Sequence, residues 1–270
     1  MNRKRTTMAL GWRVYGLGVM SVGLASVVFR EFDPGQPVPV SFPARSALAC
    51  AVGAFMVLAA AAVEWRRIAL WAAAALTVYY ATVVVMLMNG RVLLTHFAEY
   101  GTYENLAEQV AIAAGGLIVF STFAGTDGKI HSVVAARLIR VGQLAFGVCA
   151  LVWGGAHFVY MNLTAPLVPK WLPPSQVFWG YATGACFIAA GVAILTGVKA
   201  RLAVILLTTM LASFGLLIHE PILLANHSSH FNWTESAANL AILGAAWVVA
   251  DSLAPKCFGP SGSSLDEPFS

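Results

Sequence analysis

Long hydrophobic runs, separated by short polar or proline-containing stretches, fill most of the chain. Within a run the apolar positions are continuous and do not alternate with a period of two, which is typical of helices and not of barrel strands. A helix needs about 20 apolar residues to cross a bilayer core of about 30 Å. Eight runs are long enough: roughly 11–29, 44–64, 68–88, 104–123, 138–160, 177–197, 201–219 and 233–251. The pattern therefore predicts an all-α membrane protein with eight transmembrane helices.

The later runs resemble the earlier ones. At a shift of 130 residues, small residues spaced by four coincide: Ala107, Ala111 and Gly115 fall on Ala237, Ala241 and Ala245. The first run aligns with the fifth at a shift of 129, which places Gly18 on Gly147. Repeated apolar helices are a common plan of membrane proteins. We therefore expect two tandem four-helix bundles.

The boundaries of these bundles follow from the breaks between runs. The first four-helix repeat covers residues 1–124, a cytoplasmic linker covers 125–137, and the second repeat covers 138–252. Residues 253–270 are expected to form a disordered cytoplasmic tail. Small residues spaced by four predict close packing between helices.

Composition supports lipid as the surroundings of this chain. The sequence is 59% hydrophobic and only 10% charged, with a mean hydropathy of +0.76. A soluble domain carries about 25% charged residues. No segment outside the runs is long enough to fold as a soluble domain. The lipid bilayer is thus the first expected partner.

Basic residues indicate the orientation. With the N-terminus inside, only four of the 16 lysines and arginines fall in outer segments, namely Arg30, Arg45, Arg91 and Lys170. This bias follows the positive-inside rule and predicts a multi-pass protein of the bacterial inner membrane with both termini in the cytoplasm. The formal charge of +4 is a consequence of topology, and we expect no nucleic-acid partner.

Histidines gather toward the predicted outer end of the second repeat. His157 and His219 lie near the outer ends of neighbouring spans, where they could bind a metal or haem, or donate a hydrogen bond to a quinone. With Glu220 they would line an outer-facing pocket, and Trp233 and Glu235 would form its rim. The alternative is that each imidazole lies at the interface and bonds to backbone or water.

Other polar positions have simpler interpretations. His227 and His230 have a metal-ligand spacing, but a solvated polar loop explains them better. Glu104 and Glu108 lie at the start of a predicted helix, where the helix dipole favours carboxylates. At the repeat alignment the first half has lost most polar groups, since Asn89 replaces His219. Any site is therefore expected within residues 150–240.

Several short motifs in the second half resemble the DoxX-like family of four-helix bacterial membrane proteins. They read Gly-Gly-Ala-His-Phe at 154–158, Val-Pro-Lys-Trp-Leu-Pro-Pro at 168–174, Trp-Gly-Tyr-Ala-Thr-Gly at 179–184, His-Glu-Pro at 219–221 and Trp-Thr-Glu-Ser at 233–236. One complete copy covers residues 138–252, and the first half is similar to a diverged second copy. The resemblance implies the fold and an association with membrane redox complexes, but it supplies no catalytic residues.

These observations predict an accessory or structural subunit of a membrane redox assembly, with membrane protein partner subunits and a possible quinone or small-molecule pocket. A non-redox membrane scaffold is the first alternative. A small-solute transporter is the second, although few polar residues lie in the inner halves of the spans.

Overall fold

The computed structural model describes residues 10–254, which form helices and no strand. Six of the long helices are regular or nearly so: α1 (Gly11–Phe29), α2 (Arg45–Glu64), α5 (Tyr100–Thr126), α6 (Ser132–Val159), α8 (Gln176–Thr196) and α11 (His230–Ser252). Two further rods are composite. The first joins α3 (Ala69–Val78), the π-helix η1 (Tyr79–Asn89) and α4 (Gly90–Thr95), and the second joins α9 (Ala200–Phe214), the π-helix η3 (Gly215–His219) and α10 (Glu220–Ala225). Two short turns, α7 (Met161–Thr164) and η2 (Ala165–Leu167), lie between α6 and α8.

Seven helices in the described part of the chain are long and apolar enough to cross a membrane. Each of these seven helices coincides with one of the first seven predicted spans, which run from 11–29 to 201–219. The all-α membrane class and seven of the expected helices are therefore confirmed. The remaining prediction, 233–251, coincides with α11, which is not among the seven. That helix carries Asn232, Glu235 and Asn239 and packs against α1, α5 and α9. A helix enclosed by protein does not need a fully apolar surface.

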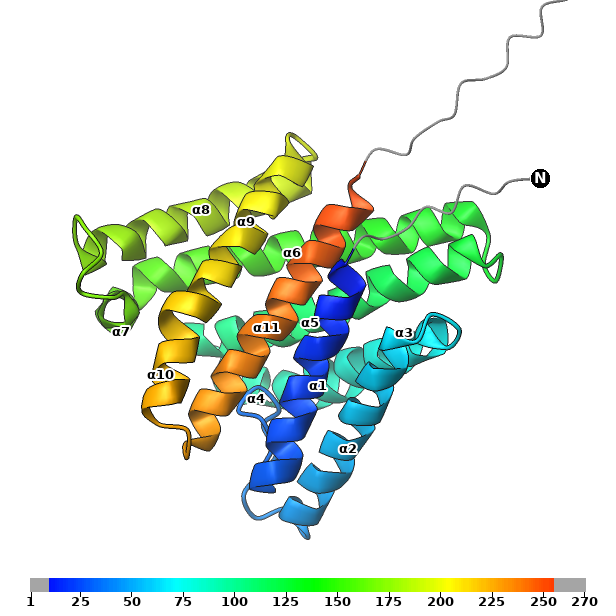
Figure 1. Cartoon of the computed structure of the whole chain (residues 1–270), viewed down its shortest axis with the longest axis horizontal. Coiled ribbons are helices and arrows are strands. Elements are labelled where there is room, and N and C mark those ends of the chain that lie inside the picture. The colour runs from blue at the N-terminus through cyan, green and yellow to red at the C-terminus, as the bar shows by residue number, and fades with distance from the viewer. Residues whose placement is uncertain (1–9, 255–270) are drawn as a thin grey trace, which may run out of the picture.

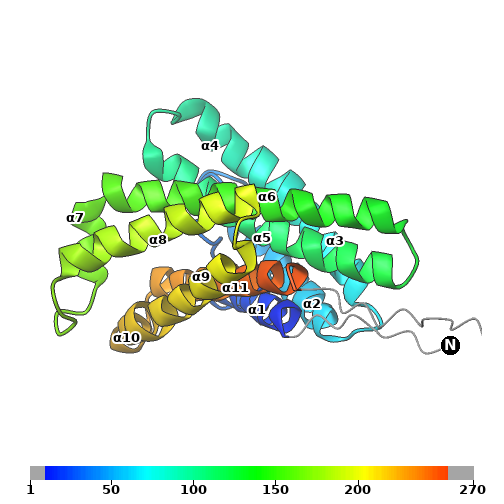
Figure 2. The ribbon, with the colours of Figure 1, turned by 90° about the horizontal axis from the view of Figure 1, so that it is seen from above.

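Both described ends of the chain lie at the same end of the molecule (Figures 1 and 2). The backbone N–H of Gly11 donates to Asp251 Oδ2 at 3.1 Å, which joins the start of α1 to the end of α11. We call this the proximal end, and it also holds the turns 65–68, 127–131 and 197–199. The distal end holds the connections 30–44, 96–99, 160–175 and 226–229.

Helix packing crosses between the two predicted bundles. The most extensive helix pair is α1 with α11, and α5 packs along α6 (Figure 1). These contacts depend on small residues, because a Cβ added at Gly18 of α1 would lie 2.4 Å from the Ala241 backbone of α11, and one at Gly142 of α6 would lie 2.6 Å from Ile118 Cγ1 of α5. Close backbone approach of this kind is how helices associate in lipid. The eight long helices therefore form one body.

The connection between the halves is shorter than the predicted linker 125–137. Helix α5 continues to Thr126 and α6 begins at Ser132. Arg66 pairs with Asp127 at 2.8 Å, which links this turn to the α2–α3 turn. Of the predicted tail 253–270, only residues 253 and 254 lie within the described residues.

Candidate functional site

A cavity of about 780 Å³ lies between α5, α6, α8, the α9–η3 rod and α11, toward the distal end. Sites for small molecules usually measure about 300–1,000 Å³. Most of the wall is apolar and comes from Trp153, Phe187, Leu207, Met210, Leu211, Phe214, Leu217 and Ile242, with Leu167, Val168 and Leu172 of the α6–α8 connection at one edge. An apolar molecule drawn from the bilayer therefore fits its walls.

The polar part of the lining contains two histidines and three glutamates: His157 of α6, His219 of η3, Glu104 and Glu108 of α5, and Glu235 of α11. The cavity thus brings together side chains that are up to 131 residues apart in sequence, from Glu104 to Glu235. Thr183, Thr209, Ser213 and Asn239 add smaller polar groups. Ionisable groups inside a membrane bundle are costly, and they commonly mark a functional site.

The structure places three of the five predicted pocket residues in this lining, namely His157, His219 and Glu235. Glu220 and Trp233 do not line the cavity. Glu220 is exposed, and the Trp233 ring is 42% exposed with its Nε1 donating to the His227 carbonyl at 2.8 Å. Glu220 directly follows His219, and Trp233 lies two residues before Glu235, but each occupies a different face of its helix from that lining residue.

His157 is held from one side by α8. Its Nδ1 lies 3.2 Å from the Gly180 carbonyl oxygen and 3.1 Å from Thr183 Oγ1. Because a carbonyl only accepts, Nδ1 donates to Gly180, and Nε2 is left to accept from a ligand. The ring packs near Phe187 and Phe214, with centroid distances of 5.4 Å and 6.4 Å.

His219 ends the π-helix η3 and makes no hydrogen bond with its ring to any described residue. π-helical turns often occur at functional sites, because the extra residue re-aims the side chains that follow. The corresponding π-helix of the first rod, η1, ends at the buried Asn89. The hydrophobic pattern of the sequence gave no indication of either π-helix.

The glutamates are not helix caps, so that prediction is wrong. Helix α5 begins at Tyr100, four residues earlier than expected, and its first turn holds no acidic residue. The dipole effect is confined to the first turn. Glu104, Glu108 and Glu235 instead lie close enough for their charges to repel one another.

No lysine or arginine neutralises these carboxyl groups within residues 10–254. The two salt bridges found there are Arg45 with Glu31 and Arg66 with Asp127, both away from the cavity. The cavity therefore offers any occupant several carboxyl groups that no lysine or arginine neutralises.

Asp33 adds a fourth carboxyl group that the sequence interpretation missed. It lies in the 30–44 connection but is only 5% exposed. Burial and the charge of Glu235 raise its pKa to about 7, although the hydrogen bond from the Gly35 N–H at 2.7 Å opposes the shift. A position in a loop gives no sequence signal that its carboxyl is buried.

The first half has not lost its polar residues, which corrects a second expectation. Asn89 Nδ2 donates to the Gly35 carbonyl at 2.9 Å, and Asn105 Nδ2 donates to Asn89 Oδ1 at 2.9 Å. Tyr79 Oη donates to Gln36 Oε1 at 2.7 Å. These uncharged amides form a closed hydrogen-bonded cluster, whereas the second half has ionisable groups around a cavity.

The weak metal candidates do not come together. His227 is exposed, and the His230 ring packs against Phe29 with centroids 5.1 Å apart. Within the described residues, no group of three histidine, cysteine, aspartate or glutamate side chains has the arrangement to hold a metal ion.

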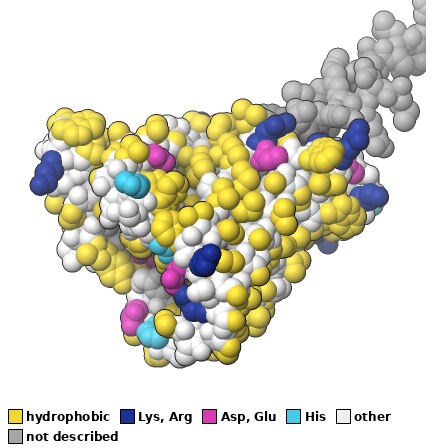
Figure 3. Space-filling model, turned by 60° about the horizontal axis from the view of Figure 1, so that its bottom comes forward, with side chains coloured by type: hydrophobic (Ala, Val, Ile, Leu, Met, Phe, Trp, Pro, Cys, Tyr) yellow, Lys and Arg dark blue, Asp and Glu magenta, His cyan; other side chains and the backbone are white. Residues whose placement is uncertain are grey.

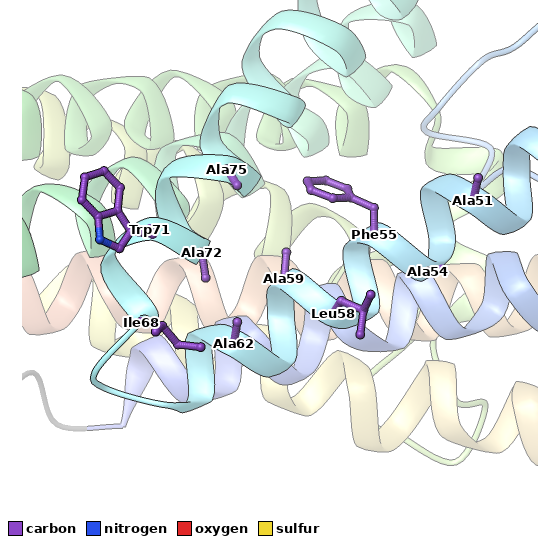
Figure 4. A pocket seen from close by; sticks show the side chains of 10 residues that line it. All are labelled: Ala51, Ala54, Phe55, Leu58, Ala59, Ala62, Ile68, Trp71, Ala72 and Ala75. Carbon is purple, nitrogen blue, oxygen red and sulfur yellow. The ribbon is translucent and has the colours of Figure 1, made fainter.

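A second hollow lies between α2 and α3, and none of the residues that line it is ionisable. Figure 4 shows its lining of alanines with Phe55, Leu58, Ile68 and Trp71. Such a surface is compatible with acyl chains. Figure 3 shows that hydrophobic side chains cover much of the visible surface, with acidic and histidine side chains appearing toward the distal end.

The distal cavity is thus the one place in the described chain where an apolar enclosure, accepting imidazole nitrogens and uncompensated carboxyl groups coincide. It can hold an apolar body and bond a polar head group. The chain matches no family model, no curated protein and no solved structure with which it was compared.

Proposed function

We propose that this protein spans the bacterial inner membrane eight times with both termini in the cytoplasm. Helix α11 would be the eighth span, since it packs along α1, itself a candidate span, for much of its length (Figure 1). The proximal end carries basic turns such as Arg66-Arg67 and Lys199, whereas the cavity glutamates and Asp33 lie toward the distal end. The positive-inside rule then puts the proximal end in the cytoplasm and the cavity on the outer side.

We infer that the halves are diverged repeats of one four-helix unit. In the first half, Gly23 of α1 packs against Gly53 of α2. In the second half, Gly154 of α6 packs against Gly184 of α8, and both glycines lie 131 residues after their counterparts. The contacts between the halves correspond in the same way, because Gly11 of α1 packs against Val248 of α11 and Gly142 of α6 packs against Ile118 of α5. In this register Ser26 corresponds to His157, whereas the shift of 129 expected for the first run would place Val28 there. The DoxX-like resemblance of the second half favours the same interpretation.

The function that the geometry supports best is binding of a small amphipathic molecule from the membrane, and the class we propose is an isoprenoid quinone bound in its reduced quinol form, whose hydroxyl groups donate hydrogen bonds. The observation that carries this proposal is the cavity itself, whose apolar wall encloses two imidazoles and three carboxyl groups. A planar ring would fit beside Phe187 and Phe214, near His157 and His219. We propose that the protein serves as an accessory subunit of a membrane redox assembly, whose partner subunits carry out electron transfer.

Two other functions have less support. A scaffold would need free small-residue faces, but Gly18, Gly115 and Gly244 are used for packing within the chain. A transporter would need a polar path to the proximal end. There Gln143 bonds to Ser252 at 3.0 Å, and Arg140 bonds to the Ile194 and Leu195 carbonyls, so these groups are occupied and do not line the cavity.

The test is titration of the purified protein, under anaerobic conditions, with a decyl-substituted benzoquinol, whose hydroxyl groups can donate to His157 Nε2. We expect saturable binding by the wild type and a Kd about tenfold higher for His157→Ala, because one hydrogen bond and a ring contact are lost. Glu220→Gln is the matched control, since Glu220 is exposed at the same end, and its Kd should equal that of the wild type. Absence of saturable binding, or equal Kd values for all three proteins, would rule out the proposed site.

A further inference from the structure

The polar cluster of the first half already holds an occupant, which is the chain's own Gly35-Gln36 segment. The Gly35 carbonyl accepts from Asn89, and Gln36 Oε1 accepts from Tyr79. Gln36 Nε2 lies 3.5 Å from Met56 Sδ, and the Gln36 side chain is 1% exposed. A Cβ added at Gly35 would lie 2.1 Å from Gln109 Nε2, so the segment packs closely against the Gln109 side chain.

The residues that surround this segment correspond to residues that line the cavity of the second half. The composite rods begin at residues 69 and 200, a difference of 131, and end at 95 and 225, a difference of 130. Helices α5 and α11 begin at 100 and 230, again 130 apart. In this register Met56, Tyr79, Asn89 and Gln109 correspond to Phe187, Met210, His219 and Asn239, all of which line the cavity.

The second half does not fill its own site in this way. The 160–175 connection contributes Leu167, Val168 and Leu172 to the cavity edge. Gln176, which follows that connection, donates to the Val168 carbonyl at 2.5 Å and so stays within its own loop. The space that Gly35-Gln36 fills in the first half is therefore open in the second.

From this comparison we infer that the cavity is the open counterpart of a self-filled site, and that its ligand is an amphipathic molecule whose polar head donates hydrogen bonds, such as an amine or a hydroxyl. The inference rests on the proposed binding function and specifies its ligand class. Asn105, whose amide N–H donates to its neighbour in the first half, corresponds to Glu235, so an amide donor is replaced by a carboxyl oxygen that can accept.

Charge points to the same head group. Glu104, Glu108 and Glu235 lie around this part of the cavity, and the lining residues include no lysine or arginine. An ammonium or hydroxyl head satisfies these acceptors through charge-assisted bonds, whereas a carboxylate head is repelled. The cavity thus selects against anionic lipids and fatty acids of similar length.

The experiment uses three probes with the same C12 chain: dodecylamine, dodecanol and dodecanoate. The full chain carries a single cysteine, introduced as Met210→Cys, and is reconstituted in lipid nanodiscs. Its native cysteines are replaced by alanine, namely Cys50, Cys149, Cys186 and Cys257. The rate of labelling by N-ethylmaleimide is measured with and without each probe. We expect dodecylamine to protect the thiol at a concentration about tenfold below that needed for dodecanol, and dodecanoate to give no protection. Adding Glu235→Gln should remove most of the amine preference, whereas adding Glu220→Gln should leave it intact.

A matched cysteine tests whether the first-half site is filled. Met56→Cys, next to Gln36, should label at least about 100-fold more slowly than Met210→Cys, because hindered thiols react only on local opening. If Met56→Cys does not fold, the equivalent pair Asn105→Cys and Glu235→Cys gives the same comparison. Equal labelling rates in the two halves would overturn the self-filled site.

The outcomes separate the inference from the proposed function. If none of the probes protects Met210→Cys, the binding function itself is wrong. If all three protect equally, or if dodecanoate protects best, the cavity binds amphiphiles but the donor head group is wrong.

Discussion

Buried polar side chains give this membrane bundle its chemistry, and Asp33 shows most clearly how the surroundings set their properties. Its carboxyl lies in a connection, yet burial and the nearby Glu235 charge raise its pKa from 3.8 to about 7. His157 shows the complementary effect of geometry, because one ring nitrogen is committed to Gly180 and the other is left for a ligand. In both cases the residue type was visible in the sequence, but its role depends on neighbours from other helices.

Asp33→Asn should change how stability depends on pH. A raised pKa in the folded state means that the native protein keeps a proton that the unfolded chain has released, so stability falls as pH rises toward about 7 and then levels off. From pH 5 to pH 8 the contribution of Asp33 is a loss of about 3 kcal/mol, from a span of about two pH units at 1.36 kcal/mol each. Asparagine keeps an oxygen for the Gly35 N–H and cannot ionise.

Thermal unfolding in detergent at the two pH values measures this effect. Relative to the wild type, Asp33→Asn should gain about 3 kcal/mol of stability between pH 5 and pH 8. Glu99→Gln, which removes an exposed carboxyl, serves as the control and should keep the wild-type pH dependence. A variant equally destabilised at both pH values would show that the Asp33 carboxyl is ionised in the folded protein.

At the scale of elements, glycine and alanine residues set the close contacts between helices. The α1–α11 pair comes close enough that a Cβ at Gly18 would overlap the Ala241 backbone. Continuous apolar runs located the long helices, with ends within seven residues of those in the structure, because length and apolarity are properties of each segment. It did not reveal the π-helices or the partner of each helix, since these depend on contacts between segments.

Gly18→Ala should therefore be strongly destabilising, by about 2 kcal/mol or more, because backbone atoms of α11 cannot move away without separating the helices. Gly90→Ala is the matched control. There the nearest atom to an added Cβ is the Val85 carbonyl oxygen at 3.6 Å, an ordinary contact, and alanine favours the helix by about 0.5–1 kcal/mol. Unfolding temperatures in one detergent give the comparison, and a Gly18→Ala protein as stable as Gly90→Ala would contradict the packing described.

At the scale of the whole molecule, the halves share one interior. The first helix of each half packs against the last helix of the other, as α1 does with α11 and α6 does with α5. The cavity reflects this exchange, because α5 of the first half supplies Glu104 and Glu108 to a site otherwise formed by the second. A site confined to residues 150–240, as expected from the sequence, would lack both carboxyl groups.

The proposed orientation predicts which end of the molecule reagents outside the cell can reach. In a cysteine-free background, Val40→Cys at the distal end and Lys129→Cys at the proximal end are both exposed positions. A membrane-impermeant maleimide added to intact cells should label Val40→Cys, and should label Lys129→Cys only after the cells are opened. The reverse pattern would place the cavity on the cytoplasmic side.

The sequence by itself determined the membrane setting and the helical class, because a continuous apolar run of sufficient length has few stable alternatives in lipid. It also singled out His157, His219 and Glu235. Tertiary structure alone decided that these residues share a cavity with Glu104 and Glu108, that Glu220 and Trp233 lie outside it, and that Asp33 is buried. Those outcomes depend on which helices cross and at what height, and such contacts between distant segments leave no periodic trace along the chain.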